Sequence, residues 1–451
     1  MIMTTEEIFV LIIEIIAAFI MTIAIFRQPY MGLVFTIASQ PIAIILPQIS
    51  IFSSIVPIIG LVTIVAFLIK ARNEKIRGVF RFSSPHLLAL LLIFWILITH
   101  PNAAWFGADR NWIFTYLQLW VLMWLTGFLL DTPRKHHVLM WVFSLCTLIS
   151  AAVIVFQSGV IEEIDPTNRA SGLSPGANTA ARYFVISFIF LYYLNTITKK
   201  VLIKLIAIAG LLISFLGVFY TVSRTGILLL GISVFLLFLL QSNFKNRTTV
   251  LLVTFIAFSL LMVFSSSILD FVQGIVPSIS QGTDTVGLRY ALWEAGWEMF
   301  KDHPISGVGI GKFPMELRNY PNPSYSLFFR KGLVAHNMYV SMLAETGIIG
   351  LTLFMSLIIA TLANLIKSRK RADPTLKSIA NVWLIVLIII LVGGITKTDQ
   401  VDKLFWLSMG TSIFLTHQLK VRAAFSKQNN DKSWSASVLQ KRGNLVNTHG
   451  K

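Results

Sequence analysis

The sequence predicts an all-α, polytopic integral membrane protein with about 12–13 transmembrane helices and one long outward-facing loop that contains short helices. Three observations predict this fold class. Hydrophobic residues make up 55% of the chain and charged residues only 13%, which is far from the composition of a soluble globular domain. The mean hydropathy is correspondingly high, at +0.76. Apolar runs of about 17–25 residues, each long enough for one bilayer crossing, recur along the chain.

The apolar runs predict about thirteen membrane segments. Pro41, Pro47 and Pro57 fall in or beside the second and third segments, and a merger of these two would reduce the count to about twelve. The predicted segments are roughly 8–26, 31–47, 51–70, 86–100, 112–130, 138–157, 178–197, 202–220, 225–241, 250–268, 337–363, 379–396 and 404–419.

The distribution of Lys and Arg predicts the orientation of these segments. One set of alternating loops, together with the C-terminal tail, holds 25 of the 37 basic residues and only four acidic ones. An excess of Lys and Arg marks cytoplasmic loops, so this side is predicted to be cytoplasmic. The opposite side holds 12 basic residues and nearly all the carboxylates. The net charge of +17 is therefore mostly a topology signal with some attraction to anionic lipid, and it does not imply nucleic acid.

This orientation divides the chain into four predicted parts. They are an N-terminal bundle of about ten helices at 1–268, an outward (periplasmic) loop at 269–335, C-terminal membrane helices at 336–419, and a basic cytoplasmic tail at 420–451. The polar composition of the tail predicts disorder. The single cysteine, Cys146, excludes an intramolecular disulfide. The acidic start MIMTTEE does not favour a cleaved signal peptide.

Four arginines on the outward side lie at or near predicted helix ends, and two interpretations compete for them. An arginine at a helix end can reach lipid headgroups and do nothing else. A permanent cation close to the membrane can instead mark a functional site. Arg182, which opens a helix, fits both interpretations about equally. Arg224 favours function, because the turn Val222–Thr225 joins two apolar runs almost without a loop. Arg169 lies in the segment NRASGLSPGAN.

Arg289 begins the longest polar stretch of the chain body. If Leu288–Asp302 is helical, successive residues turn by about 100°, which places Arg289 on one face with Trp293 and Gly296. The acidic residues of this stretch then lie on the opposite face. A purely solubilising arginine would be expected among them, so this pattern favours a functional cation over an interfacial one.

His336 stands where the chain re-enters the membrane. On a helix it would share a stripe with Leu343, Gly347 and Gly350, and the small residues of that stripe would let a neighbouring helix approach. On spacing alone, a histidine that caps the helix or contacts headgroups is favoured over a catalytic one.

Several known motifs are absent from the sequence. GVGIGKF (Gly307–Phe313) resembles a phosphate-binding loop only in part, because that motif needs Gly at Ser306 and Ser or Thr at Phe313. The outward side shows no pair of carboxylates with the spacing of a metal-binding glycosyltransferase, and no Cys/His cluster. The sequence therefore predicts no metal and no cofactor.

Four segments together resemble the O-antigen ligase and O-antigen polymerase superfamily of bacterial membrane glycosyltransferases. The two segments nearest the C-terminus are specific. Their combined pattern, Arg…Trp…Met-Phe-x-x-x-Pro-x-x-Gly-x-Gly followed by His-Asn-x-Tyr…Glu-x-Gly-x-x-Gly, is hard to obtain by chance. The predicted topology agrees over the rest of the chain. The four segments are NRASGLSPGAN (Asn168–Asn178), VSRTGILLLG (Val222–Gly231), LRYALWEAGWEMFKDHPISGVGIGKF (Leu288–Phe313) and AHNMYVSMLAETGIIGLTLF (Ala335–Phe354).

The resemblance implies a metal-independent transferase in the bacterial inner membrane with its site facing the periplasm. It would move a glycan from an undecaprenyl diphosphate carrier to an acceptor hydroxyl on lipid A core, another repeat unit or a protein. By the same resemblance His336 is the candidate general base, Arg224 and Arg289 bind the diphosphate, and Arg169 lies in a matching segment. Supporting roles are implied for the remaining site residues, which are Arg182, Asn337, Tyr339 and Glu345.

Physical chemistry agrees with this resemblance. Guanidinium groups can offset the charge of a diphosphate leaving group, and a neutral histidine can accept the proton of a hydroxyl. Two other classes remain open. A flippase or transporter for lipid-linked sugars should carry charges midway through several helices, whereas Glu14 is the clearest such charge here. A structural scaffold would not account for the face on which Arg289 lies.

Overall fold

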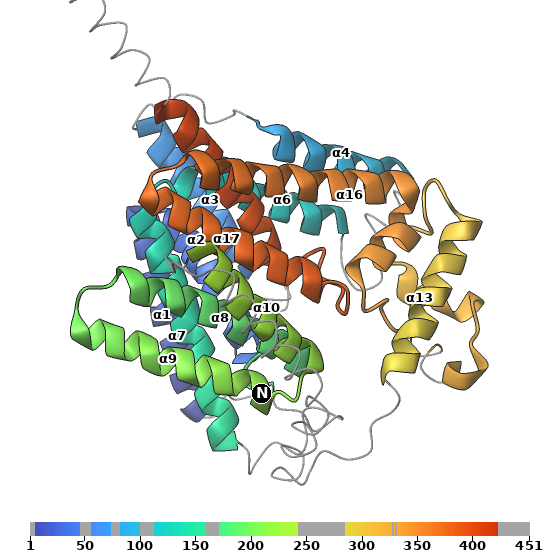
Figure 1. Ribbon diagram of the computed structural model, residues 1–451, viewed down its shortest axis with the longest axis horizontal. Helices are drawn as coiled ribbons and strands as arrows, with labels where there is room; N and C mark the ends of the chain where they lie inside the picture. Colours follow the sequence, from blue (N-terminus) through green and yellow to red (C-terminus); the bar gives the residue numbers. More distant parts are fainter. Residues whose placement is uncertain are drawn as a thin grey trace, which may run out of the picture.

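The structure is a computed structural model, and it describes residues 5–45, 56–73, 82–99, 112–157, 171–241, 285–326, 329 and 332–422. Every regular element within those ranges is a helix, which confirms the all-α prediction. The elements are shown in Figure 1. In chain order they are α1 (Thr5–Arg27), α2 (Tyr30–Ala38), η1 (Gln40–Ile45), α3 (Val56–Asn73), α4 (Ser84–Thr99), α6 (Trp112–Leu129), α7 (Pro133–Gln157), α8 (Ala177–Ile197), α9 (Val201–Tyr220), α10 (Arg224–Gln241), α13 (Thr285–Asp302), α14 (Phe313–Glu316), η2 (Leu317–Asn319), η3 (Pro323–Tyr325), α16 (Met338–Arg371), α17 (Pro374–Gly393) and a last helix at 403–422.

In the described part of the chain, seven helices are long and apolar enough to cross a membrane: α3, α6, α7, α8, α9, α16 and α17. Shorter apolar helices lie in α1, α4 and α10. The prediction of a multi-pass membrane protein is therefore confirmed. The segment predicted at 250–268 and most of the tail predicted at 420–451 lie outside the described residues, although the last helix extends to residue 422.

The prediction of one membrane helix at 31–47 is wrong. α2 ends at Ala38, and the chain continues as the short 3₁₀ helix η1 from Gln40 to Ile45. Pro41 explains the break. Proline disfavours the α conformation of the residue before it and supplies no backbone N–H for the helix.

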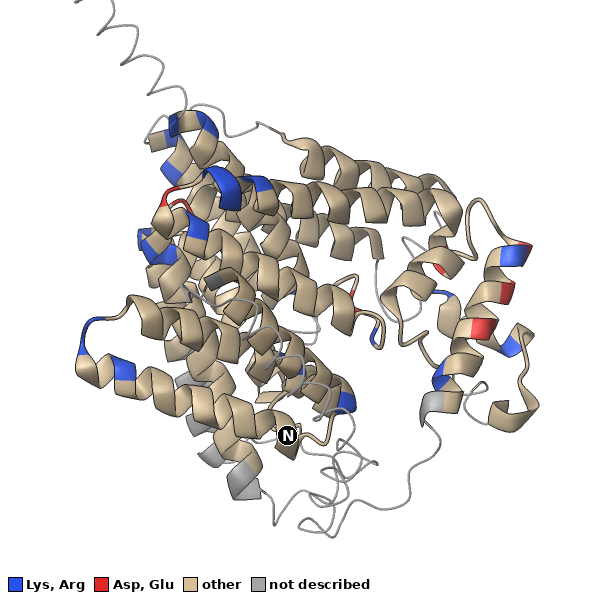
Figure 2. Cartoon of the chain, viewed as in Figure 1, with Lys and Arg blue, Asp and Glu red and all other residues tan. Residues whose placement is uncertain are grey.

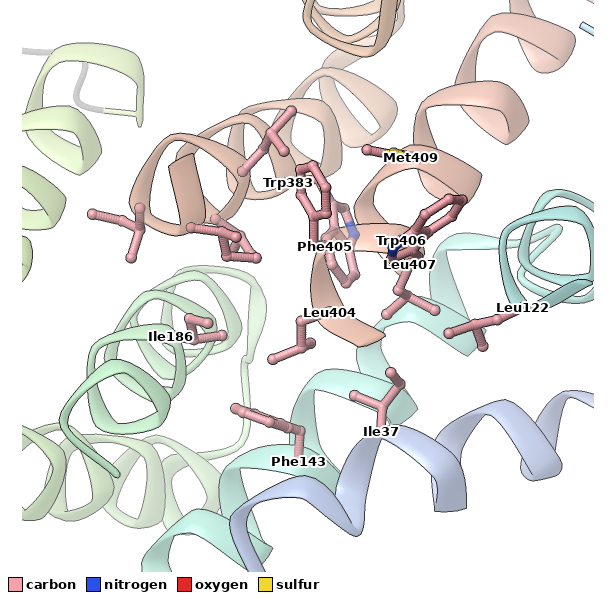
Figure 3. Close-up of a cluster of buried hydrophobic side chains, with 14 of the residues drawn as sticks. Ile37, Leu122, Phe143, Ile186, Trp383, Leu404, Phe405, Trp406, Leu407 and Met409 are labelled. Atoms are coloured by element: carbon pink, nitrogen blue, oxygen red, sulfur yellow. The ribbon is translucent and has the colours of Figure 1, made fainter. Parts of the chain in front are cut away.

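Large apolar side chains from helices distant in the sequence form one core (Figure 3). Trp383 of α17 and Trp406 of the last helix are completely buried there, and Ile186 of α8 and Phe143 of α7 lie in the same cluster. In α8 and α17, 72% of the membrane-length window is buried, against 28% in α9. α8 and α17 are therefore central helices, and α9 presents most of its apolar surface outward.

Charged residues are unevenly distributed along the bundle (Figure 2). Lys and Arg gather where α8 passes into α9 and where α16 passes into α17, whereas α13 at the other end carries several acidic residues. The start of α10, the end of α17, the start of α16 and α13 form this second end, which we call the site end. It corresponds to the side predicted to face outward.

Candidate functional site

The segment that carries His336 is fixed by backbone contacts on both sides. The indole Nε1 of Trp293 on α13 donates to the carbonyl of Ala335 at 3.2 Å. The backbone N–H of Met338 donates to the carbonyl of Gly394, after α17, at 2.8 Å. Between these points Asn337 caps α16, because its Oδ1 accepts from the N–H groups of residues 339 and 340. Asn337 is therefore the helix cap, and a capping role for His336 is excluded.

His336 itself has an unusual backbone conformation. Its φ is +48°, in the left-handed region that residues other than glycine rarely adopt. Such backbone strain persists where the surrounding structure holds it, and the contacts of Ala335 and Met338 do so here. The side chain is half-buried. Burial lowers the pKa of His336 from its ordinary value, and the nearby charges of Arg289 and Lys397 lower it further.

The helix predicted at Leu288–Asp302 is confirmed as α13, and its faces are arranged as predicted. Gly296 is buried, Arg289 is half-buried and Glu294 is exposed. The buried face packs on α16, where Val340 lies against Gly296. Arg289 is consequently held close enough to His336 to affect its pKa.

Lys397 is a second cation beside His336, and the sequence analysis did not single it out. It lies after α17 in the polar segment TKTDQVDK (Thr396–Lys403). Its Nζ is 2.7 Å from Oγ1 of Thr179 and 3.3 Å from Oδ1 of Asp399. The sequence feature that could have identified Lys397 is this cluster of charges between two apolar runs on the outward side.

Arg182 is buried inside the protein, whereas contact with lipid headgroups requires an exposed side chain. Its side chain is only 2% exposed, and its guanidinium pairs with the carboxylates of Asp399 and Asp402, the latter at 2.8 Å. The interpretation of Arg182 as a headgroup-contacting arginine is therefore wrong. It is an internal ion-pair partner that holds the segment after α17 against α8.

Arg224 is the first residue of α10 and its side chain is exposed. The preceding turn is tightly built, because Oγ of Ser223 accepts from the N–H of Gly226 and donates to Oδ1 of Asn178. The hydroxyls of Thr225 and Thr396 lie 3.2 Å apart. Since Thr396 precedes Lys397, this contact places the Arg224 turn beside the segment that carries Lys397.

The two specific motifs of the sequence interlock through their backbones. The N–H of Gly309 donates to the carbonyl of Glu345 at 3.0 Å, and the N–H of Ile348 donates to the carbonyl of Pro304 at 2.9 Å. Gly347 has φ +67°, and this interrupts α16. A continuous stripe from His336 to Gly350 is therefore absent, and Gly347 admits the backbone of Ile305 rather than a neighbouring helix.

Two further supporting residues have contacts that position the backbone. Oε1 of the buried Glu345 accepts from the N–H of Phe313, at the start of α14, at 3.3 Å. The hydroxyl of Tyr339 donates to the carbonyl of Leu391 at 2.9 Å. Both side chains therefore join α16 to its neighbours. Arg169 lies outside the described residues.

The site end thus brings His336 together with several cations. Arg289 and Lys397 are close enough to His336 to act on its charge. Arg224 is the first residue of α10, and the residue after it, Thr225, contacts Thr396. Such an arrangement can bind a multiply charged anion, and its histidine can accept a proton.

A comparison with protein families finds one matching model. Residues 209–355 match the family described as O-Antigen ligase, and three of the four segments quoted above lie within that range. No curated protein matches the chain. The family supports a glycosyltransferase-like function in glycan assembly at a membrane, with lipid-linked glycan substrates. Residues 209–355 are thus similar to the O-antigen ligase family, and the resemblance of this chain to the O-antigen ligase and polymerase superfamily is confirmed.

Proposed function

We propose that this protein transfers a glycan from undecaprenyl diphosphate to an acceptor hydroxyl at the periplasmic face of the bacterial inner membrane, without a metal. The observation that carries this proposal is the half-buried His336 held beside Arg289 and Lys397, at the same end of the bundle as Arg224. A site at the membrane edge suits a donor whose lipid lies in the bilayer and whose sugars lie in water.

His336 acts as the general base in this proposal. Its neutral imidazole takes the proton of the acceptor hydroxyl while the hydroxyl oxygen attacks the anomeric carbon of the donor. The bond from that carbon to the diphosphate oxygen breaks, and the diphosphate leaves with the bonding electrons. Arg224 and Arg289 offset its charge through guanidinium contacts. Burial and the nearby charges of Arg289 and Lys397 lower the pKa of His336, which favours the neutral imidazole that can accept a proton.

The test is transfer in vitro by the purified full-length protein with a lipid-linked oligosaccharide donor. Lipid A core, a second lipid-linked repeat unit and a protein with exposed Ser or Thr are offered as separate acceptors. Formation of a product with one of these acceptors supports the proposal. The acceptor used then identifies the enzyme as a ligase, a polymerase or a protein O-oligosaccharyltransferase. Movement of the donor across vesicles without any transfer would instead identify a flippase and refute the proposal.

A further inference from the structure

The segment after α17 carries opposite charges in different environments. The carboxylates of Asp399 and Asp402 are buried, with side chains 2% and 7% exposed. The ammonium of Lys397 belongs to a side chain that is 31% exposed. The two carboxylates of this segment therefore lie inside the protein, whereas the Lys397 side chain is only half-buried.

Both carboxylates are already occupied by other groups. Arg182 pairs with Asp399 and Asp402 at once. The second oxygen of Asp402 accepts from the N–H groups of Leu404 and Phe405, so it caps the last helix. Asp399 shares its remaining oxygen with Lys397 at 3.3 Å, which is longer than the usual 2.7–2.9 Å of a charge-assisted hydrogen bond. Arg182 thus neutralises carboxylates that would otherwise bind the Lys397 ammonium more closely.

The ammonium of Lys397 has a donor to spare. An ammonium carries three N–H donors. One is directed to Thr179 at 2.7 Å and a second to Asp399, while the third has no partner among the residues that the structure describes. Thr179 and Asp399 therefore fix the position of the ammonium without using its full capacity.

The segment that carries Lys397 contacts the segments that carry the other candidate groups of the site. The residue before it, Thr396, contacts Thr225 in the turn next to Arg224. Three residues earlier in the chain, Gly394 binds the N–H of Met338, close to His336. A donor that contacts both Arg224 and His336 would pass beside Lys397.

We propose that Lys397 is a third cation of the diphosphate site, positioned by Arg182, Asp399 and Thr179 to contact a phosphate oxygen. This inference rests on the proposed transferase function and adds a substrate-binding residue to it. Three cations match a diphosphate better than a monophosphate, because the diphosphate presents more charge and more acceptor oxygens. An ammonium on a flexible stem suits a phosphate as a compact point charge, beside the planar guanidinium groups.

Lys397 also affects the base. Among the described residues, the charges of Arg289 and Lys397 act on His336, and Lys397 is in turn influenced by Arg182, Asp399 and Asp402. Removal of the Lys397 charge should raise the pKa of His336. A general base works in its neutral form, so the acidic fall of the transfer rate should then occur at a higher pH.

The experiment compares Lys397→Met and Lys397→Gln with the matched control Lys301→Met, using the purified full-length protein in nanodiscs. Lys301 pairs with Glu298 on the exposed face of α13 and lies outside the proposed site. The probes are undecaprenyl diphosphate and undecaprenyl monophosphate. Loss of one charge-assisted contact should weaken diphosphate binding by about tenfold or more, with a smaller effect on the monophosphate. The control should bind as the wild type does.

Two readouts separate this role from a structural one. Lys397→Gln can still hydrogen-bond to Thr179 and Asp399. It therefore allows the binding measurement even if the methionine variant does not fold. A folded Gln variant with wild-type diphosphate affinity and an unshifted acidic limb would overturn the inference, while loss of transfer in Arg289→Ala would leave the proposed function intact. A wild-type protein that neither binds the lipid diphosphate nor transfers glycan would instead refute the proposed function itself.

Discussion

Gly347 of α16 lies with its α carbon directly against the backbone carbonyl of Ile305, so that a β carbon at this position would overlap that carbonyl. Its φ of +67° and ψ of −170° belong to a region that is essentially restricted to glycine. The close approach joins the segment after α13 to the helix that follows His336. It is thus one of the contacts that hold α13, and Arg289 with it, against the start of α16.

The first prediction concerns this contact. Gly347→Ala should destabilise the protein by about 1–3 kcal/mol from backbone strain, with a further cost from the overlap with Ile305. Gly60 is the matched control. It lies inside α3, and nothing stands within 4 Å of the position of an added β carbon. Gly60→Ala should be neutral or stabilising by up to about 1 kcal/mol. Thermal unfolding in detergent measures both, and equal transition temperatures for the two variants would contradict the argument.

The second prediction concerns Arg182. Arg182→Met removes the guanidinium that pairs with two buried carboxylates, which should cost about 3–5 kcal/mol of stability. The triple variant with Asp399→Asn and Asp402→Asn should recover much of this loss, because Asn at position 402 still caps the last helix. Yield and thermal unfolding of the three proteins provide the measurement. A single variant as stable as the wild type would show that these buried ion pairs do not stabilise the fold.

The third prediction concerns the two arginines proposed to hold the diphosphate. Arg224→Ala or Arg289→Ala should abolish transfer while the protein stays folded and inserted. Lysine should rescue poorly, since it keeps the charge but loses the planar fork. Arg318, an exposed arginine of η2, provides a control whose replacement by Ala should leave transfer unchanged. Full activity of both lysine variants would argue that only a positive potential is needed.

The fourth prediction concerns His336. His336→Ala should lower transfer by about 10²–10⁴-fold, the usual contribution of a positioned proton acceptor. Donor binding should survive, and His336→Gln should not restore turnover because an amide cannot take the proton. Wild-type turnover of the Gln variant would show that His336 only orients the substrate.

The pH dependence of the wild type gives an independent test of the same group. The pKa of His336 is lowered from its ordinary value of 6.5, so the neutral form predominates at neutral pH. The transfer rate should therefore be level near pH 7 and fall only as the pH drops below 6.5, through the pKa of the folded protein. A fall centred above pH 7 in the wild type would contradict this assignment.

The fifth prediction concerns topology. In a Cys146-free background, cysteine at the exposed Ser324 should react with an impermeant reagent in intact cells. Cysteine at the exposed Thr375, in the first turn of α17 and close to the basic end of α16, should react only after the membrane is opened. The reverse pattern would place the site end in the cytoplasm.

The sequence by itself determined the membrane class, most helix positions and the face of α13 on which Arg289 lies. These features depend on local patterns: the length of apolar runs, the side on which Lys and Arg collect, and a helical period near 3.6 residues. The break after Ala38 was not predicted, because the apolar run resumes directly after Pro41. The candidate general base was identified only through the resemblance, since spacing alone favoured a cap.

Only the tertiary structure decided what Arg182, Lys397 and Gly347 do. Arg182 meets its two carboxylates across more than two hundred residues of chain, and no local pattern distinguishes it from an arginine that reaches headgroups. Lys397 becomes a neighbour of His336 because the carbonyl of Gly394 binds the N–H of Met338. Gly347 looked like a small residue on a helix stripe, but its backbone conformation is imposed by the approach of Ile305. Each of these roles comes from contacts between distant segments, and those contacts exist only once the helices have packed.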